Sequence, residues 1–247
     1  MKQENELTYY ENVKNWNFDK FEIELDKLTD WDLFEIIKGM ATKESKILDL
    51  GTGGGEKVIA YYPECKEIIG TDFSKAMIET AIKNLIKSGR KNIKFRLMDN
   101  LKMDVPNDYF DIVVARNTVT DPCQIYKCLK KGGYLIIHGV DKDDCYSLKR
   151  LFNNEQDYNC IKPISIIDYD NTLNAGFKDV ELVPIHVREY FKNEELFIKF
   201  LEMVPIINDF NSILTYDKEK MNLYIKENTY EGKIRLLRRY YGITARK

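Results

Sequence analysis

Short apolar runs alternate with amphipathic stretches through the first 140 residues of the chain. Five runs have the length and composition of buried strands. They cover residues 46–50, 67–72, 92–98, 110–115 and 134–140. The stretches between them place apolar residues at helical spacing over 56–62, 74–89 and 122–129. Short strands that alternate with helices form parallel sheets covered on both faces, so the pattern predicts a doubly wound α/β fold.

The two flanking segments have weaker periodicity. Residues 1–43 read as polar and aromatic helices, which predicts an N-terminal helical cap. The inward positions expected in this cap are Leu25, Leu28, Leu33, Ile36 and Ile37. Beyond residue 145, the pattern predicts helices over 164–175, 194–208 and 218–226, and strands over 180–190 and 242–246.

These elements together predict a single domain over residues 1–247. Its sheet has seven strands, most of them parallel, with the core in residues 44–145. The C-terminal half, 146–247, carries a helical insertion at about 192–235, before a last edge strand. The mixed basic and apolar segment 235–241 is interpreted as a helix with one solvated face, although its bases and aromatics also occur together on RNA-binding surfaces.

The composition narrows the classes of partner. The 247 residues contain 38 Lys and Arg against 40 Asp and Glu, a formal net charge of -2. This balance gives no bulk attraction to nucleic acid or to an anionic membrane, although a local basic patch stays open. No apolar run reaches the roughly 18 residues of a membrane span, and the first residues lack a signal-peptide core, so a cytoplasmic protein is expected.

The cysteines point to reduced thiols and to no metal site. Their number is odd, and no two of them have Cys-x-x-Cys spacing. They are Cys65, Cys123, Cys128, Cys145 and Cys160. Cys123 follows Asp121-Pro122, as the nucleophile of cytosine-C5 methyltransferases follows a proline. The tripeptide also fits a helix start with aspartate as the cap, and this reading is favoured.

A glycine-rich loop follows the first of the five strands. Residues 47–55 read ILDLGTGGG and lead into a helix. A sharp turn that a ligand must approach closely requires glycine, although an ordinary strand-to-helix turn explains a lone Gly-x-Gly-x-Gly equally well. The loop lacks the Lys-Ser/Thr ending of a phosphate loop. Asp49, two residues before the first glycine, would repel a pyrophosphate. Asp49 would suit a ligand that carries cationic nitrogen or sulfur.

Acidic residues also end the next two strands. Asp72 ends the second strand, where a carboxylate can accept hydrogen bonds from ribose hydroxyls. Asp99 and Asn100 end the third, where an acid or an amide can meet an adenine edge. Each is by itself typical of a turn or a helix cap. Their occurrence in order after a glycine loop predicts an adenosyl ligand.

Five segments carry a resemblance to a known family. They are ILDLGTGGG (47–55), IIGTDFSKAMIETA (68–81), FRLMDN (95–100), FDIVVARNTV (110–119) and LKKGGYLII (129–137). With them the chain resembles the class I S-adenosylmethionine-dependent methyltransferases, near the ubiquinone-biosynthesis branch, over about residues 45–140. The resemblance implies S-adenosyl-L-methionine as cofactor, S-adenosyl-L-homocysteine as product and a small-molecule acceptor that the sequence does not identify.

The resemblance also implies roles for individual residues. Asp49, Gly51 and Gly53 would hold the methionine end, and Asp72 would bind the ribose. Phe73 and Met77 would pack on the adenine. Asp99 and Asn100 would recognise its amino group. The backbone around Ala115 and Arg116 would close over the methionyl group.

Two further features each have two interpretations. His138 lies on the fifth strand, and the favoured interpretation is a core histidine whose hydrogen bonds are made within the protein. It becomes the general-base candidate if its side chain reaches the carboxyl edge of the sheet. The aromatic residues Tyr9, Tyr10 and Trp16 are typical of a lid over a cofactor or of simple helix packing.

Three other functions stay open. An RNA methyltransferase would need a basic surface beside the pocket. A nucleoside-binding protein of this fold would bind the cofactor without turnover. An aminopropyl transferase would need an acid-rich polyamine groove, which the sequence does not show. The oligomeric state is not predicted.

Overall fold

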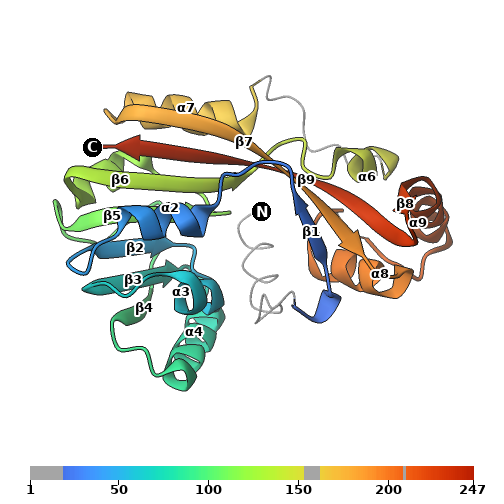
Figure 1. The fold of residues 1–247 in the computed structure, drawn as a ribbon, viewed down its shortest axis with the longest axis horizontal. Helices are drawn as coiled ribbons and strands as arrows, with labels where there is room; N and C mark the ends of the chain where they lie inside the picture. Colours follow the sequence, from blue (N-terminus) through green and yellow to red (C-terminus); the bar gives the residue numbers. More distant parts are fainter. Residues whose placement is uncertain (1–18, 153–161, 208–209) are drawn as a thin grey trace.

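The computed structural model describes residues 19–152, 162–207 and 210–247. One mixed sheet of nine strands runs through this part of the chain (Figure 1), in the order β1-β7-β9-β6-β5-β2-β3-β4, with β8 paired to β9. Tyr9, Tyr10, Trp16 and Cys160 lie outside the described residues. The predicted α/β class with a mostly parallel core is confirmed. The predicted number of seven strands was wrong, because β1 and β8 also join the sheet.

Five parallel strands form one half of the sheet. They are β2 (Lys46–Leu50), β3 (Glu67–Asp72), β4 (Ile93–Leu97), β5 (Phe110–Arg116) and β6 (Leu129–Val140). All five were predicted, and β6 alone begins clearly earlier than expected. Leu129 already pairs with Phe110, and a register shift then follows before Tyr134 pairs with Ile112.

Helices cover both faces of this parallel half. α2 (Leu33–Met40), α3 (Glu56–Tyr61) and α4 (Lys75–Ser88) contribute to one core with Val114 and Ile136, whereas α5 (Pro122–Cys128) and α7 (Ile164–Asn174) pack with Val113 and Ile137 on the other face. Within residues 19–152, 162–207 and 210–247, no helix combines the length and the apolar composition that crossing a bilayer requires.

Helix ends follow the sequence signals. Ser74 caps α4 by accepting a hydrogen bond from the amide of Met77, and Gly89 ends that helix in the left-handed region, at φ 70°. Asp121 caps α5 through the amides of Cys123 and Gln124. This confirms the interpretation of Asp121-Pro122-Cys123 as a helix start.

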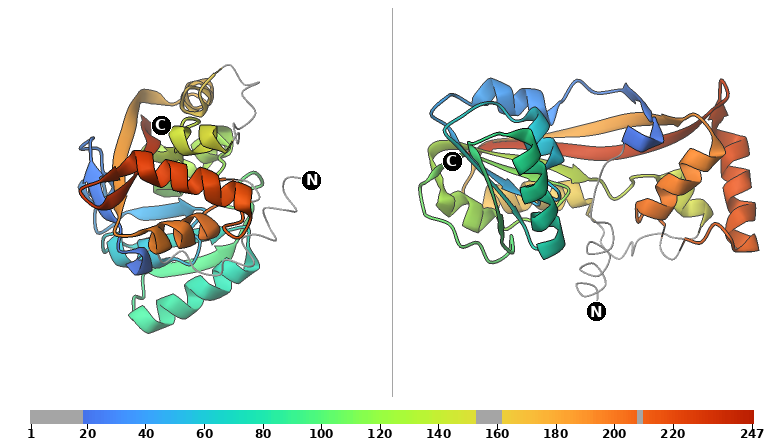
Figure 2. Two further views of the ribbon diagram at one scale, coloured as in Figure 1. Left: turned by 90° about the vertical axis from the view of Figure 1, so that its right-hand side faces the viewer. Right: turned by 90° about the horizontal axis from the view of Figure 1, so that it is seen from below.

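The antiparallel half consists of β1 (Glu24–Lys27), β7 (Lys178–Phe191), β8 (Thr229–Tyr230) and β9 (Lys233–Arg246). β7 and β9 are long and continue beyond the parallel strands (Figures 1 and 2). Around their far ends lie α6 (Tyr146–Leu151), α8 (Glu194–Met203), α9 (Thr215–Asn228) and the short 3-10 helix η1 (Asp19–Phe21). A second apolar core fills this region, with Phe191, Phe197 and Leu236 among its members.

Two predictions in the flanks were wrong. Residues 24–27 are a strand rather than part of a helical cap, because they extend the sheet beside β7. Leu25 and Leu28, expected to face inward, are therefore 54% and 45% exposed, whereas Leu33 and Ile37 in α2 are buried as predicted.

The last strand was also misread. It begins at Lys233 rather than Gly242, and it lies between β6 and β7 instead of at an edge. The segment 235–241, predicted as a helix, belongs to it. Alternate side chains of β9 point to one face, where Ile234, Leu236 and Arg238 are buried. The charge of Arg238 at an inward position concealed this two-residue period.

Arg238 is buried because two carboxylates neutralise it. Its Nε and Nη2 donate to the two carboxylate oxygens of Asp144, each at 3.0 Å, and Nη1 lies 3.3 Å from Oε2 of Glu189. The backbone amide of Arg239 donates to Asp144 at 2.8 Å. Burial raises the pKa of Glu189, and the charge of Arg238 opposes this shift. The Asp144–Arg238–Glu189 triad thus ties β7 and β9 to the loop that follows β6.

Candidate functional site

The glycine loop begins at the carboxyl edge of β2. Gly51, Gly53 and Gly55 all have positive φ, of 72°, 58° and 75°. A Cβ at Gly51 would lie 2.7 Å from Cβ of Thr118. The loop therefore requires glycine both for its conformation and for space. The loop packs closely on the segment that follows β5, at the edge where such sheets bind ligands.

The strand register aligns several predicted residues in one row. β2 and β5 pair Leu50 with Ala115, and β5 and β6 pair the next residue, Arg116, with His138. Gly51 follows Leu50, so the loop begins in the row of Arg116 and His138. Asp49 pairs with Val114, two residues before Arg116. Because side chains alternate along a strand, those of Asp49, Arg116 and His138 lie on the same face.

Asp72 is built into the loop from the neighbouring strand. Its Oδ2 accepts the amide of Gly53 and its Oδ1 the amide of Ser74, each at 2.9 Å. The residue is buried, and burial raises the pKa of its carboxyl. A carboxylate offers about four acceptor positions, so the backbone amides leave part of this capacity unused.

Asp49 is buried beneath the loop and accepts a hydrogen bond from the hydroxyl of Tyr62. Burial raises the pKa of Asp49 to about 6, against the opposing effects of this hydrogen bond and of the charge of Arg116. Burial also raises the pKa of Tyr62 far above its usual value, so the phenol stays protonated as the donor. The guanidinium of Arg116 forms no hydrogen bond or ion pair with any residue in the described ranges.

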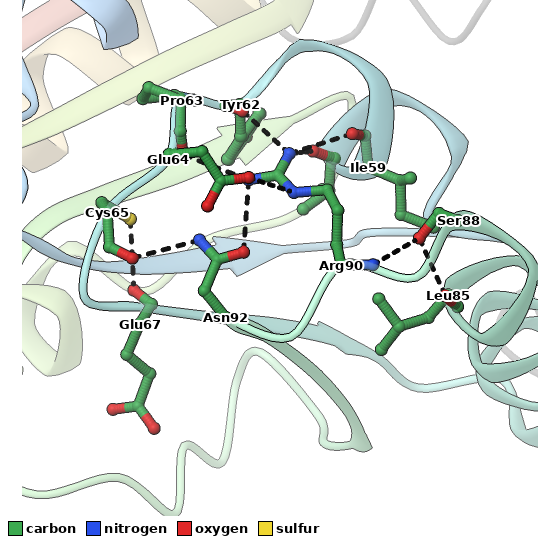
Figure 3. Close-up of polar contacts among 11 residues, drawn as sticks. Ile59, Tyr62, Pro63, Glu64, Cys65, Glu67, Leu85, Ser88, Arg90 and Asn92 are labelled. Atoms are coloured by element: carbon green, nitrogen blue, oxygen red, sulfur yellow. Dashed lines mark hydrogen bonds and ion pairs between the residues drawn. The ribbon is translucent and has the colours of Figure 1, made fainter.

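Arg90 fixes the turn that presents Tyr62 (Figure 3). Its Nη1 donates to the carbonyls of Ile59 and Tyr62, both at 2.9 Å, and its Nη2 to that of Pro63 at 3.2 Å. These are carbonyls at and beyond the end of α3, which a helix cannot satisfy by itself. Nε pairs with Glu64 at 3.2 Å. Arg90 thus acts on Asp49 through the position of Tyr62.

Asn100 presents an unused acceptor beside the loop. Its Nδ2 donates to Oγ1 of Thr118 at 2.9 Å and approaches the carbonyl of Val119 at 3.5 Å. Its Oδ1 is buried and has no hydrogen-bond partner among the residues that the structure describes. A buried acceptor without a donor is costly, which indicates a ligand donor such as an amino group. Asp99 is exposed and accepts the amide of Leu101 within its own turn.

The two predicted packing residues differ in their surroundings. Phe73 follows Asp72 at the edge and is 43% exposed. Met77, one turn into α4, is buried, and its amide is held by the Ser74 cap. Phe73 is therefore exposed at this edge, whereas Met77 lies in the interior.

The structure thus brings Asp49, Asp72 and Asn100 together around one loop, each from a different strand end. Asp72 bonds the loop directly, Asn100 bonds Thr118, which packs on Gly51, and Asp49 lies directly before the loop. The set fits a ligand with a cationic group, neighbouring hydroxyls and an exocyclic amine. The four cysteines that the structure describes, Cys65, Cys123, Cys128 and Cys145, are free thiols.

Sequence reasoning missed Tyr62, Arg90 and Asn117 as contributors to the site. Tyr62 was counted as the end of a helix, and no local pattern indicates its contact with Asp49, thirteen residues away. Arg90 has no recognisable motif. Asn117 does have a signal, because asparagine is one of the few residues that tolerate positive φ, and it adopts φ 52° directly after β5.

Comparison with known proteins agrees with this geometry. Residues 41–196 match a family model described as "Methyltransferase domain". The chain belongs to this family, which confirms the predicted class, the S-adenosylmethionine-dependent methyltransferases, and S-adenosyl-L-methionine as its cofactor.

Two curated relatives match part of the chain. The uncharacterized methyltransferase YcgJ of Bacillus subtilis is 34% identical over 73 residues, which are 30% of this chain and 29% of that protein. The ribosomal protein L11 methyltransferase of Listeria welshimeri is 30% identical over 115 residues, or 44% of this chain and 36% of that protein. The alignments thus span about a third of the relatives' lengths.

Solved structures share the fold over more of the chain. The crystal structure of Bacillus subtilis YcgJ superposes with a TM-score of 0.57 at 18% identity, over 86% of this chain and 96% of that one. A Haemonchus contortus phosphoethanolamine N-methyltransferase 2, in complex with phosphomonomethylethanolamine and S-adenosylhomocysteine, gives 0.55 at 17% identity, over 98% and 57%. At these identities the similarity shows the fold.

Proposed function

We propose that this protein transfers the methyl group of S-adenosylmethionine to a small-molecule acceptor. The observation that carries the proposal is that Asp49, Asp72 and Asn100 meet at one glycine loop, with Oδ1 of Asn100 lacking a hydrogen-bond partner among the described residues. A lone loop of this kind occurs in many turns. Three buried groups with unused hydrogen-bonding capacity around it favour a ligand.

The proposed roles follow the order of the strands. Asp49 faces the α-ammonium of the cofactor, with the backbone of Gly51 and Gly53 beside it. Asp72 accepts the ribose hydroxyls, and Phe73 packs on the adenine, backed by Met77. Asn100 accepts a hydrogen bond from the adenine amino group.

Two further assignments complete the proposed site. Asp99 shapes the turn that positions Asn100, and the backbone at Arg116 borders the methionyl group. When bound, the cofactor supplies an electrophilic methyl on a sulfonium. The chain then orients the two reactants at attack distance and excludes water.

A small-molecule acceptor is the favoured class. The structurally similar Haemonchus contortus enzyme holds phosphomonomethylethanolamine in its crystal structure. The ubiquinone-biosynthesis branch remains a prediction: the Coxiella burnetii enzyme UbiE is 25% identical over 134 residues. Because the chain also matches ribosomal protein L11 methyltransferases, a protein acceptor is the alternative that the experiment must distinguish from a small molecule. We propose further that residues 1–247 act as one methyltransferase domain.

Release of S-adenosylhomocysteine, measured with a panel of acceptors, tests this function. The panel contains small phenols, carboxylic acids, amines and thiols, together with ribosomal RNA and ribosomal protein L11. Turnover with a small molecule and none with the two macromolecules is expected. Tight cofactor binding with turnover on L11 or RNA alone would contradict the small-molecule proposal. Failure to bind S-adenosylhomocysteine would contradict the function altogether.

A further inference from the structure

The ring of His138, near the carboxyl end of β6, lies beside two aromatic side chains. Its centroid lies 6.0 Å from that of Trp31 and 4.9 Å from that of Tyr240, with tilts of 33° and 38°. Trp31 belongs to the segment between β1 and α2, and Tyr240 to β9.

The position of Trp31 depends on a glycine in the neighbouring strand. β6 and β9 pair His138 with Gly242. A Cβ at Gly242 would lie 2.4 Å from Cε2 of Trp31. Trp31 can lie over the sheet next to His138 only because that position has no side chain.

Asn117 holds the imidazole by its edge. Its backbone amide donates to the carbonyl of His138 at 2.8 Å, and its Oδ1 lies 3.1 Å from Nδ1 of the ring. The residue adopts φ 52°, a conformation that costs most side chains free energy. Two hydrogen bonds to the same residue account for its retention of this conformation.

The contact with Asn117 determines which ring nitrogen carries the proton. An amide oxygen only accepts hydrogen bonds, so Nδ1 must be the donor in a neutral imidazole. Nε2 is then left with a lone pair. No residue that the structure describes donates a hydrogen bond to Nε2.

The surrounding charges keep the ring neutral. Burial lowers the pKa of His138 to about 4, and the charges of Arg116 and Arg238 act in the same direction, against the weaker effect of Asp32. The same two cations repel an ammonium group near the ring. A neutral hydroxyl is therefore a better neighbour for Nε2 than a protonated amine.

We propose that Nε2 of His138 accepts the proton that a hydroxyl acceptor loses on methylation, and that Asn117 is the residue that positions it. The inference rests on the proposed methyltransferase function and names its acceptor class. The acceptor oxygen forms a bond to the methyl carbon, and the carbon–sulfur bond breaks, with its electron pair staying on sulfur. The hydroxyl proton moves to Nε2, and imidazolium later releases it to solvent.

The tautomer is measured directly by NMR on the full chain labelled with 15N-histidine. There are two histidines, and the exposed His186 on β7 is the internal reference. At pH 7 we expect His138 to carry its proton on Nδ1. Asn117→Ala should move the proton towards Nε2, whereas Asn117→Asp keeps an acceptor oxygen and should retain the Nδ1 proton. A wild-type ring protonated on Nε2 would overturn the proposal.

Turnover provides the second readout, with the phenol of the panel that gives the fastest S-adenosylhomocysteine release. His138→Gln should lower kcat by roughly 10²–10⁴-fold, the range for loss of a general base, while the Kd of S-adenosylhomocysteine changes less than about twofold. Asn117→Ala should lower kcat less, Asn117→Asp should recover it, and His186→Gln should match wild type.

The two proposals fail in different ways. If wild type binds S-adenosylhomocysteine and His138→Gln turns phenols over at the wild-type rate, this inference is wrong and the proposed function stands. The same holds if wild type methylates amines and thiols but no phenol. If wild type does not bind S-adenosylhomocysteine, the proposed function fails first.

Discussion

Each half of the sheet contains a cluster of buried polar groups, and the two clusters differ in how their hydrogen-bonding capacity is used. In the antiparallel half, Arg238 donates to Asp144 from two nitrogens and also contacts Glu189. In the parallel half, Asp72 retains acceptor positions, and Oδ1 of Asn100 has no partner in the described part of the chain.

On the proposed function, the difference is one between groups that stabilise the fold and groups that bind the cofactor. A buried charge whose partners all come from the chain is neutralised in the folded state itself. A buried acceptor that the chain leaves unused lowers stability until something else donates to it. Variants in the antiparallel cluster should therefore affect unfolding most, and variants in the parallel cluster should affect cofactor binding most.

The largest expected effect is the loss of Arg238. Arg238→Met leaves Asp144 and Glu189 buried without a cation, so the free energy of unfolding should fall by about 3–5 kcal/mol. Urea unfolding followed by circular dichroism measures it. Arg239→Met is the matched control, because Arg239 is half-exposed and lies 3.8 Å from Asp143, a pair worth at most about 1 kcal/mol. Equal losses for both variants would show that the buried triad has no special role.

A smaller loss is expected where the antiparallel half packs against Trp31. Gly242→Ala places a methyl group 2.4 Å from the indole ring, so the side chain or the strand must shift. Such overpacking lowers the free energy of unfolding by about 1–3 kcal/mol. The fluorescence of Trp31 should change with it. An unchanged unfolding midpoint would mean that Trp31 does not lie over β9.

The parallel half should respond to pH through Asp49. Its pKa of about 6 means that the carboxyl is ionised above pH 6 and neutral below it. Since a cationic ligand group needs the ionised form, affinity for S-adenosylhomocysteine should fall as pH decreases through 6, by about tenfold per unit. Calorimetric titrations between pH 5 and 8 measure this. Asp49→Asn should bind weakly at every pH, and a wild-type profile that stays flat would contradict the role of Asp49.

The smallest effect should have the opposite sign. Gly39 lies inside α2, and a Cβ there would meet nothing within 4 Å. Gly39→Ala should raise the free energy of unfolding by about 0.4–1 kcal/mol, because glycine loses more backbone entropy in a helix. The midpoint of urea unfolding measures this increase. Gly242→Ala, the same substitution at a position without space for a methyl group, is the comparison. A decrease would indicate an undetected contact at α2.

The parallel half could be predicted because its signals are local. Ser74, Asp121 and the glycines after β2 act within a few residues of their own position. Strand ends in a parallel sheet share one edge, so the grouping of Asp49 and Asp72 also followed from sequence order.

The rest of the fold and of the candidate site depends on contacts between distant segments. Arg238 lies 94 residues from Asp144, and its burial on β9 cannot be read from a segment whose pattern also suits a helix. The bond from Tyr62 to Asp49 and the bond between Asn117 and His138 depend on where turns and strands finally lie. Propensity could not decide these, because tertiary packing overrides it.

Calorimetric titration of S-adenosylhomocysteine into wild type and Asp72→Ala tests the central claim most directly. Asp104→Ala, at an exposed position after β4, is the control, and circular dichroism checks that each variant is folded. We expect Asp72→Ala to weaken binding by roughly 1.5–3 kcal/mol, the range for lost hydrogen bonds to a charged group, with Asp104→Ala unchanged. A folded Asp72→Ala variant that binds as tightly as wild type would contradict the claim that these strand ends hold the cofactor.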